Sequence, residues 1–174
     1  MTRTGSHDRD APGATAPGAS PEHELDAPPW LRVESTLMAT SRAIREAYDA
    51  RFAVLDLNLT QASLLVFVHE AGPLHQTQLA RRLGQGRAAT GSTVDQLERR
   101  GLVERQPDPH DRRAWLVTLT AAGKERVDPI TEIDRELRAE LRLDISHGER
   151  QQLAGLLLRL QANLARVLAE TRGA

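Results

Sequence analysis

Charged residues gather at one point of the chain, between two short stretches of apolar and β-favouring residues. Asp111, Arg112 and Arg113 follow a Pro-Asp-Pro-His sequence, and residues 102–105 and 115–119 flank this polar segment. Turn-forming residues between two such stretches predict a β-hairpin with a charged tip. Guanidinium groups bind phosphate oxygens and base edges, and a neighbouring carboxylate can hold one guanidinium in place. The tip is therefore a candidate nucleic-acid contact, with Asp111 as the residue that fixes it.

A helix is predicted upstream over residues 87–100, with Val94 and Leu97 facing inward and Gly101 ending it. A shorter helix over residues 77–83 precedes it. Two helices and a basic hairpin are typical of the winged helix-turn-helix, in which the second helix enters the major groove of DNA. The residues expected to contact DNA are Arg87, Ala88, Ala89, Thr90, Ser92, Asp95, Gln96, Arg112 and Arg113.

The distribution of charge supports this interpretation, although the net charge of the whole chain is −1. Residues 75–113 contain eight arginines against five acidic residues, whereas residues 1–29 contain two arginines against five acidic residues. A basic excess on the reading module is the footprint expected of a DNA-binding protein.

The spacing of Asp111, Arg113, Leu119 and Thr120 resembles the DxRxxxxxLT signature of the MarR family of bacterial transcriptional regulators. The segments LARRLG and LERRGLV are also similar to the usual sequences of this family. The resemblance covers residues 31–171. It implies a homodimer formed by the first and last helices, and entry of one of the two wing arginines into the minor groove.

The chain departs from the family pattern in two places. His75 and Gln76 stand where a serine or threonine commonly begins a helix, and residues 88–92 read AATGS where the reading helix commonly reads STVTR. The second difference removes a frequent arginine and places a glycine inside a helix, which costs roughly 1 kcal/mol relative to alanine. The operator of relatives therefore does not transfer to this chain.

Composition and apolar spacing divide the chain into three parts, and the expected fold is mainly α with a small β-hairpin. Residues 1–29 form an acidic leader, rich in Pro, Ala and Gly, that is expected to be disordered. Residues 30–58 and 121–174 are expected to form a helical dimerisation region around a DNA-binding lobe at residues 59–120.

Capping residues predict the helix boundaries outside the reading module. Thr60 is expected to cap a buried helix over residues 61–70. Thr120 is expected to cap a long helix that reaches Leu143, and Pro129 either bends this helix or lies near its first turns. Ser146 begins the last helix with a capping box.

The last helix carries apolar residues at alternating spacings of four and three, as in a coiled-coil seam. The stripe could pack inside its own subunit, but a seam at the end of the chain has few intramolecular partners. The residues expected to form a dimer contact are Leu153, Leu157, Leu160, Leu164 and Val167.

The resemblance further implies a small phenolic or aromatic acid as effector, bound between the dimerisation helices and the reading lobe. Arginine and histidine would bind its carboxylate, and aromatic side chains would form an apolar wall. The aromatic residues and His69 could instead be ordinary core residues. The candidate ligand-binding residues are Arg45, Tyr48, Phe52, Phe67, His69 and His75.

Other classes of function are excluded or not expected. The chain has no cysteine, which excludes disulfides and thiolate zinc sites, and its histidines lack metal-site spacing, so no metal or cofactor is expected. Paired carboxylates at productive spacing, a P-loop and a nucleophile with a base partner are missing, so we expect no enzyme. No apolar run approaches the roughly 20 residues of a membrane span, and we expect a cytoplasmic protein without a membrane partner.

The predicted function is that of a homodimeric repressor that binds a palindromic operator in double-stranded DNA and is released by a small ligand. The alternative is a winged-helix adaptor that binds proteins and lacks sequence-specific DNA binding. The arginine-tipped wing favours the repressor, because an adaptor has no need of phosphate contacts.

Overall fold

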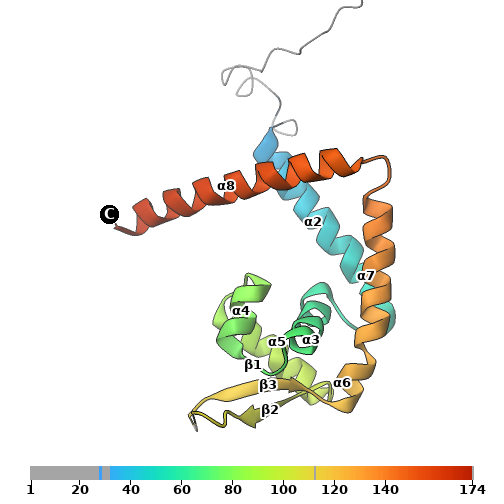
Figure 1. Cartoon of the computed structure of the whole chain (residues 1–174), viewed down its shortest axis with the longest axis vertical. Helices are drawn as coiled ribbons and strands as arrows, with labels where there is room; N and C mark the ends of the chain where they lie inside the picture. The colour runs from blue at the N-terminus through green and yellow to red at the C-terminus, as the bar shows by residue number, and fades with distance from the viewer. Residues whose placement is uncertain (1–27, 29–31, 112, 174) are drawn as a thin grey trace, which may run out of the picture. The chain divides into compact units, whose positions relative to one another are not determined.

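The computed structural model describes residue 28, residues 32–111 and residues 113–173, so the predicted leader lies almost entirely outside the described residues. The expected mainly helical fold with a small antiparallel sheet is confirmed (Figure 1). Contacts divide the chain into residues 1–44 and residues 45–174, and the second unit contains residues 59–120, the predicted DNA-binding lobe. The elements are α2 (Val33–Phe52), the 3-10 turn η2 (Ala53–Leu55), α3 (Leu59–Ala71), β1 (Leu74–His75), α4 (Gln76–Leu83), α5 (Arg87–Arg99), β2 (Val103–Pro107), β3 (Trp115–Leu119), α6 (Ala121–Glu125), α7 (Val127–Leu141) and α8 (His147–Gly173).

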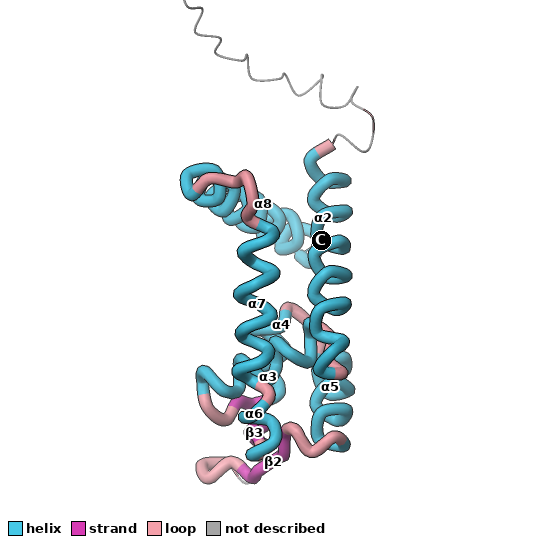
Figure 2. Tube along the Cα trace, turned by 90° about the vertical axis from the view of Figure 1, so that its right-hand side faces the viewer, coloured by secondary structure: helices cyan, strands magenta, loops and turns pink. Residues whose placement is uncertain are grey.

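The DNA-binding lobe packs α3, α4 and α5 against a three-stranded sheet (Figure 2). The strand order is β1-β3-β2, and both pairs are antiparallel. The predicted hairpin is confirmed, with Val103 opposite Leu119 and Pro107 opposite Trp115. The sequence does not predict β1, because two residues, Leu74–His75, are too few to show an alternating pattern.

Helix α3 forms the centre of the core, as its apolar composition predicts. Leu64 and Leu65 have no exposed surface, and they pack with the equally inaccessible Leu79, Val94 and Leu97 of α4 and α5. Each buried leucine contributes roughly 2 kcal/mol, so α4 and α5 are held firmly against the core. None of the described helices is long and apolar enough on its own to cross a membrane, and only α2 and α3 taken together, across a bend, reach that length and composition.

The predicted start of α3 is wrong by two residues. Asn58 is the capping residue: its Oδ1 accepts the N–H of Gln61 at 2.9 Å, and Gln61 Oε1 accepts the N–H of Asn58 at 3.2 Å. This reciprocal capping box satisfies two end groups, whereas a threonine cap satisfies one. The hydroxyl of Thr60 instead accepts a hydrogen bond from Gln85 Nε2 at 3.2 Å.

The long helix predicted after the wing, with a bend at Pro129 as one alternative, is divided at Arg126 into α6 and α7. The ring of Pro129 would clash with the carbonyl of Glu125 in a continuous helix, which explains the division. The capping box predicted for α8 is present: Ser146 Oγ accepts the N–H of Glu149 at 3.3 Å, and Glu149 Oε2 accepts the N–H of Ser146 at 2.8 Å.

Thr120 joins the end of the reading helix to the start of α6. Its hydroxyl donates to the carbonyl of Gly101 at 2.6 Å and accepts the N–H of Gly123 at 3.0 Å. We expect Thr120→Val, which keeps the shape and removes both bonds, to lower the free energy of unfolding by about 1–2 kcal/mol. Urea unfolding at fixed protein concentration measures this loss, with Thr118→Val in the middle of β3 as the control. Equal effects of the two substitutions would contradict this role of Thr120.

The apolar seam predicted on α8 remains largely open to solvent within the described chain. Leu153, Leu164 and Val167 are 53%, 51% and 56% exposed, and Leu157 and Leu160 are half-buried. Since an apolar stripe of this length is normally covered, this face is available for contact with another molecule.

Candidate nucleic-acid interface

Helix α5 exposes one side of its N-terminal half. Thr90 does not belong to that side and corrects the prediction, because it is fully buried and its hydroxyl donates to the carbonyl of Gly86 at 3.1 Å. Its polar type suggested a DNA contact, but its position on the helix directs it into the core. The predicted contact residues of this half that are exposed are Arg87, Ala88, Ala89 and Ser92.

The glycine inside the reading helix allows α4 and α5 to approach closely. A Cβ atom on Gly91 would lie 2.9 Å from Nε2 of Gln76, the first residue of α4. The same Nε2 donates to the carbonyl of Arg87 at 3.2 Å. The departure from the family pattern at residues 88–92 therefore accompanies a specific contact between the two helices.

Asp95 and Gln96 are exposed but have partners inside the protein. Asp95 Oδ1 lies 2.5 Å from Arg105 Nη2 on strand β2, and Glu98 accepts from both the guanidinium and the backbone N–H of the same arginine. Burial lowers the pKa of Arg105, but the hydrogen bond to Asp95 and the charge of Glu98 outweigh it and raise that pKa above its usual value. Gln96 Oε1 accepts from Gln61 Nε2 at 3.0 Å. These bonds attach the wing and α3 to the reading helix, a role that the sequence does not reveal.

The wing turn is held by backbone hydrogen bonds to Asp111. Its carboxylate accepts the N–H of Arg113 at 3.0 Å, and its carbonyl accepts the N–H of Ala114 at 2.9 Å. The guanidinium of Arg113 is exposed, and no hydrogen bond or ion pair joins it to another described residue. Arg112 lies outside the described residues. Arg113 is thus an exposed cation on a turn whose backbone is held in place.

A second carboxylate, which the sequence analysis missed, fixes the base of the wing. Asp108 Oδ1 accepts the N–H of His110 at 2.7 Å, and Asp108 Oδ2 lies 3.1 Å from His75 Nε2. The backbone hydrogen bond from His110 lowers the pKa of Asp108 despite the opposing effect of burial. An aspartate two residues before its backbone partner is a common turn signal, so this contact could have been predicted.

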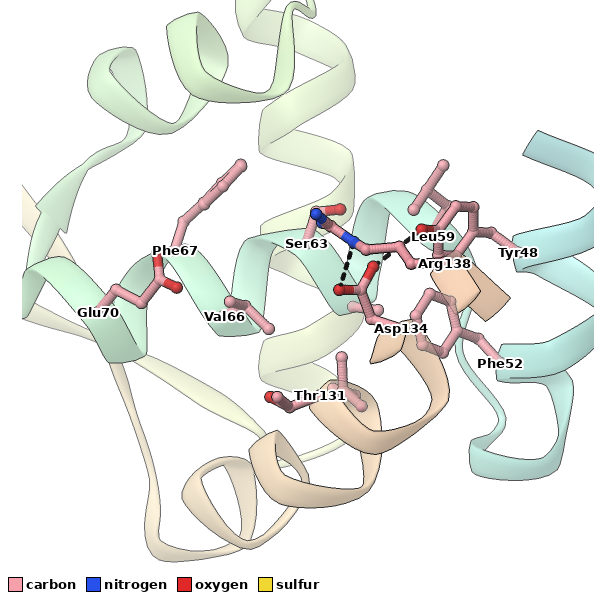
Figure 3. A pocket seen from close by; sticks show the side chains of 12 residues that line it. Tyr48, Phe52, Leu59, Ser63, Val66, Phe67, Glu70, Thr131, Asp134 and Arg138 are labelled. Atoms are coloured by element: carbon pink, nitrogen blue, oxygen red, sulfur yellow. Dashed lines mark hydrogen bonds and ion pairs between the residues drawn. The ribbon is translucent and has the colours of Figure 1, made fainter. Parts of the chain in front are cut away.

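A cavity of about 520 Å³ opens between α2, α3 and α7 (Figure 3). Tyr48 and Phe52 of α2 stack with ring centroids 5.7 Å apart on one side, and Phe67 of α3 lies on the other. Asp134 and Arg138 of α7 lie between them, and Glu70 of α3 also lines the cavity. A wall of rings with a few polar groups is the usual composition of a small-molecule site.

The structure brings together only three of the six predicted ligand-binding residues, Tyr48, Phe52 and Phe67. Arg45 Nη1 lies 3.5 Å from the hydroxyl of Thr60, His69 lines a different surface hollow, and His75 pairs with the wing. These three do not line the cavity, and its cation is Arg138, which sequence reasoning did not identify.

Tyr48, Asp134 and Arg138 form a hydrogen-bonded chain along the cavity wall. The Tyr48 hydroxyl donates to Asp134 Oδ1 at 2.9 Å, and Arg138 Nε lies 2.7 Å from Asp134 Oδ2. Burial, followed by the hydrogen bond to Asp134, raises the pKa of Tyr48 above its usual value of 10.0. The neutral Tyr48 hydroxyl therefore contributes fully to the free energy of unfolding below pH 10.0, the usual pKa of tyrosine. This contribution is lost as the pH rises through the pKa of Tyr48 in the folded protein.

The contacts among Tyr48, Asp134 and Arg138 predict that two substitutions shift the pKa of Tyr48 in opposite directions. Tyr48 is the only tyrosine in the sequence, so tyrosinate absorbance reports its pKa directly. We expect Asp134→Asn to lower the pKa of Tyr48 because it removes a negative charge, and Arg138→Gln to raise it because the arginine stabilises the phenolate. Shifts in the same direction for both variants would contradict the arrangement.

Helices α4 and α5 pack firmly against the core, α5 carries an exposed arginine, and the wing turn is held in place. Together these features define a winged helix-turn-helix DNA-binding protein. A sequence model of the MarR family matches residues 55–114. A solved probable transcriptional regulator from Pseudomonas aeruginosa is 33% identical, with 74% of this chain and 99% of that one covered and a TM-score of 0.63. The chain belongs to the MarR family and is a DNA-binding transcriptional regulator.

Two more distant structures share the fold. The Staphylococcus aureus MepR–DNA complex is 22% identical, with 76% of this chain and 96% of that one covered and a TM-score of 0.69. Bordetella bronchiseptica BpsR, whose DNA binding is regulated by 6-hydroxynicotinic acid, is 20% identical, with 76% and 94% covered and a TM-score of 0.70.

Proposed function

We propose that this regulator is a homodimeric repressor that binds a palindromic operator and is released by a small aromatic or phenolic ligand. The observation that carries the DNA-reading part is an exposed α5 surface beside a fixed wing on which the guanidinium of Arg113 has no partner among the described residues. The proposed reading residues are Arg87, Ala88, Ala89 and Ser92, with Arg113 and Arg112 from the wing. Arg87 would bind guanine or phosphate, Ser92 a base edge or phosphate, and the alanines thymine methyl groups.

The dimer is proposed to form through the seam on α8, together with α2. The exposed leucines of α8 favour a contact with a second copy, because they lack a cover within the described chain. A two-fold axis would place two copies of α5 about 34 Å apart, which is one turn of DNA. Residues 30–58 and 121–174 would then form the dimerisation region and residues 59–120 the reading lobe.

The cavity between α2, α3 and α7 is the proposed ligand site. An aromatic acid would place its ring against Tyr48 and Phe52 and its acid group at Arg138, in competition with Asp134. The 6-hydroxynicotinic acid of BpsR is a hydroxylated aromatic acid and supports this class of ligand. Since the cavity joins α3, of the reading lobe, to α7, which leads into α8, a ligand there can change the spacing of the two reading helices.

Selection of DNA fragments by the purified protein tests the proposed function. We expect an inverted repeat with half-site centres about 10 bp apart, strongly salt-dependent binding, and reduced transcription from a promoter that contains the repeat. A panel of hydroxybenzoates should weaken this binding, and Arg138→Met should abolish that response while the affinity for DNA is retained. A well-folded protein that enriches no sequence at moderate salt would instead support the adaptor.

A further inference from the structure

An exposed tryptophan lies on the wing in a hollow that the reading residues above do not use. Trp115 begins β3 and is 54% exposed, whereas Val117 and Leu119, which follow on the same face of the strand, are buried. A surface hollow of about 360 Å³ extends from this ring to Thr77 near the start of α4. The indole N–H has no hydrogen-bond partner among the described residues. A large side chain of this kind usually covers an apolar surface and donates its N–H to an acceptor.

The position of Trp115 between the reading helix and the wing tip places it where a strand of bound DNA is expected to pass. Arg105 lines the same hollow and binds Asp95 of α5, so this face of the wing is the one attached to the reading helix. Arg113 of the wing tip is only two residues away along the chain. A major groove and the adjacent minor groove are separated by one sugar–phosphate strand. Residues between a helix in the first groove and a wing tip in the second therefore face that strand.

We propose that Trp115 contacts this strand, donating its indole N–H to a phosphate oxygen and packing its ring on the adjoining deoxyribose. The inference rests on the proposed docking of α5 and the wing. Indole has a donor and no acceptor, which suits a phosphate oxygen. Arg105 and His75, which line the same hollow, already have partners inside the protein: Arg105 pairs with Asp95 and Glu98, and His75 with Asp108. The contact adds affinity without adding a free cation, which separates it experimentally from the arginine contacts.

Fluorescence isolates this contact. The sequence has two tryptophans, so Trp30→Phe leaves Trp115 as the only fluorescent indole. Titration with a duplex selected by the wild-type protein is expected to shift the Trp115 emission to shorter wavelength and to reduce its quenching by acrylamide about twofold or more, as an indole leaves water. Unchanged emission and quenching at saturating duplex would overturn the contact and leave the regulator intact. Absence of duplex binding by the wild-type protein would remove both proposals.

Substitutions give an independent measurement by anisotropy of a labelled duplex. We expect Trp115→Ala to weaken binding about tenfold, as for loss of one hydrogen bond to a charged group, with Trp115→Phe in between. The slope of log affinity against log salt should stay at the wild-type value, because no charge is lost. Gln106→Ala, an exposed change on the opposite face of the wing, is the matched control. Trp115 variants that fold normally and bind as tightly as Gln106→Ala would contradict the contact.

Discussion

Arg113→Gln is expected to weaken binding to the selected operator about 10- to 100-fold. The side chain is exposed at the wing tip, its guanidinium is unpartnered among the described residues, and Asp111 fixes its backbone. A cation held in this way can enter a narrow minor groove, where the negative potential is strong. Anisotropy titrations at several salt concentrations measure both the affinity and the slope of log affinity against log salt. That slope should fall by about one unit, which corresponds to one lost cationic contact.

Arg99→Gln is the matched control because it removes the same charge from the far end of the reading helix. Arg99 is exposed and its Nε donates to the carbonyl of Asp95 at 3.3 Å, one turn earlier in α5. We expect the affinity of the Arg99→Gln variant for the operator to stay within about twofold of wild type, because only long-range electrostatic attraction changes. If Arg99→Gln and Arg113→Gln weakened binding equally, net charge rather than the wing would explain the DNA affinity. Arg112→Gln completes the comparison and ranks the two wing arginines.

Gly123→Ala is expected to lower the free energy of unfolding by about 3 kcal/mol, the upper part of the range for overpacking in a core. A Cβ atom at this position would lie 1.9 Å from the carbonyl oxygen of Leu102 and 3.0 Å from its carbon. The obstacle is backbone, which cannot rotate away as a side chain can. The same carbonyl accepts the N–H of Thr120 at 3.2 Å, so relief of the clash would pull the start of α6 away from the wing.

Equilibrium urea unfolding at fixed protein concentration tests this prediction, because association with a second copy would otherwise change the midpoint. Gly148→Ala is the control: no atom lies within 4 Å of its added Cβ, and α8 should gain up to about 1 kcal/mol from alanine. A Gly123→Ala protein as stable as wild type would show that α6 can move freely from the wing.

The wing and the reading helix could be predicted because their signals are local. Turn residues lie between β-favouring stretches, Val94 and Leu97 follow the helical period, and Gly101 ends the helix with a positive φ of 68°. The division between α6 and α7 lies close to Pro129, at which the sequence predicts a bend as one alternative. The prediction for Thr90 is wrong because its polar side chain is typical of a DNA contact, whereas its position four residues before the buried Val94 directs it into the core.

The cavity could not be predicted in the same way, because three helices that are distant in the sequence form it. Asp134 and Arg138 are four residues apart and read as an ordinary ion pair on a solvated helix face. Only the packing of α7 beside α2 brings this pair to Tyr48. Arginine and histidine are residue types that can bind a carboxylate, but residue type does not show which cavity the side chains of Arg45 and His75 face.

The bonds between Arg105 and the acidic side chains of α5 limit how this reading helix can be retargeted to another DNA sequence. Asp95 and Glu98 attach the wing to this helix. Most variants in a library that randomises the whole helix would therefore lose this attachment and fail to assemble correctly. Variation confined to Arg87, Ala88, Ala89 and Ser92 changes the proposed DNA-contact surface and leaves the attachment intact. Four positions of α5 can therefore be varied without changing the contacts that hold the wing in place.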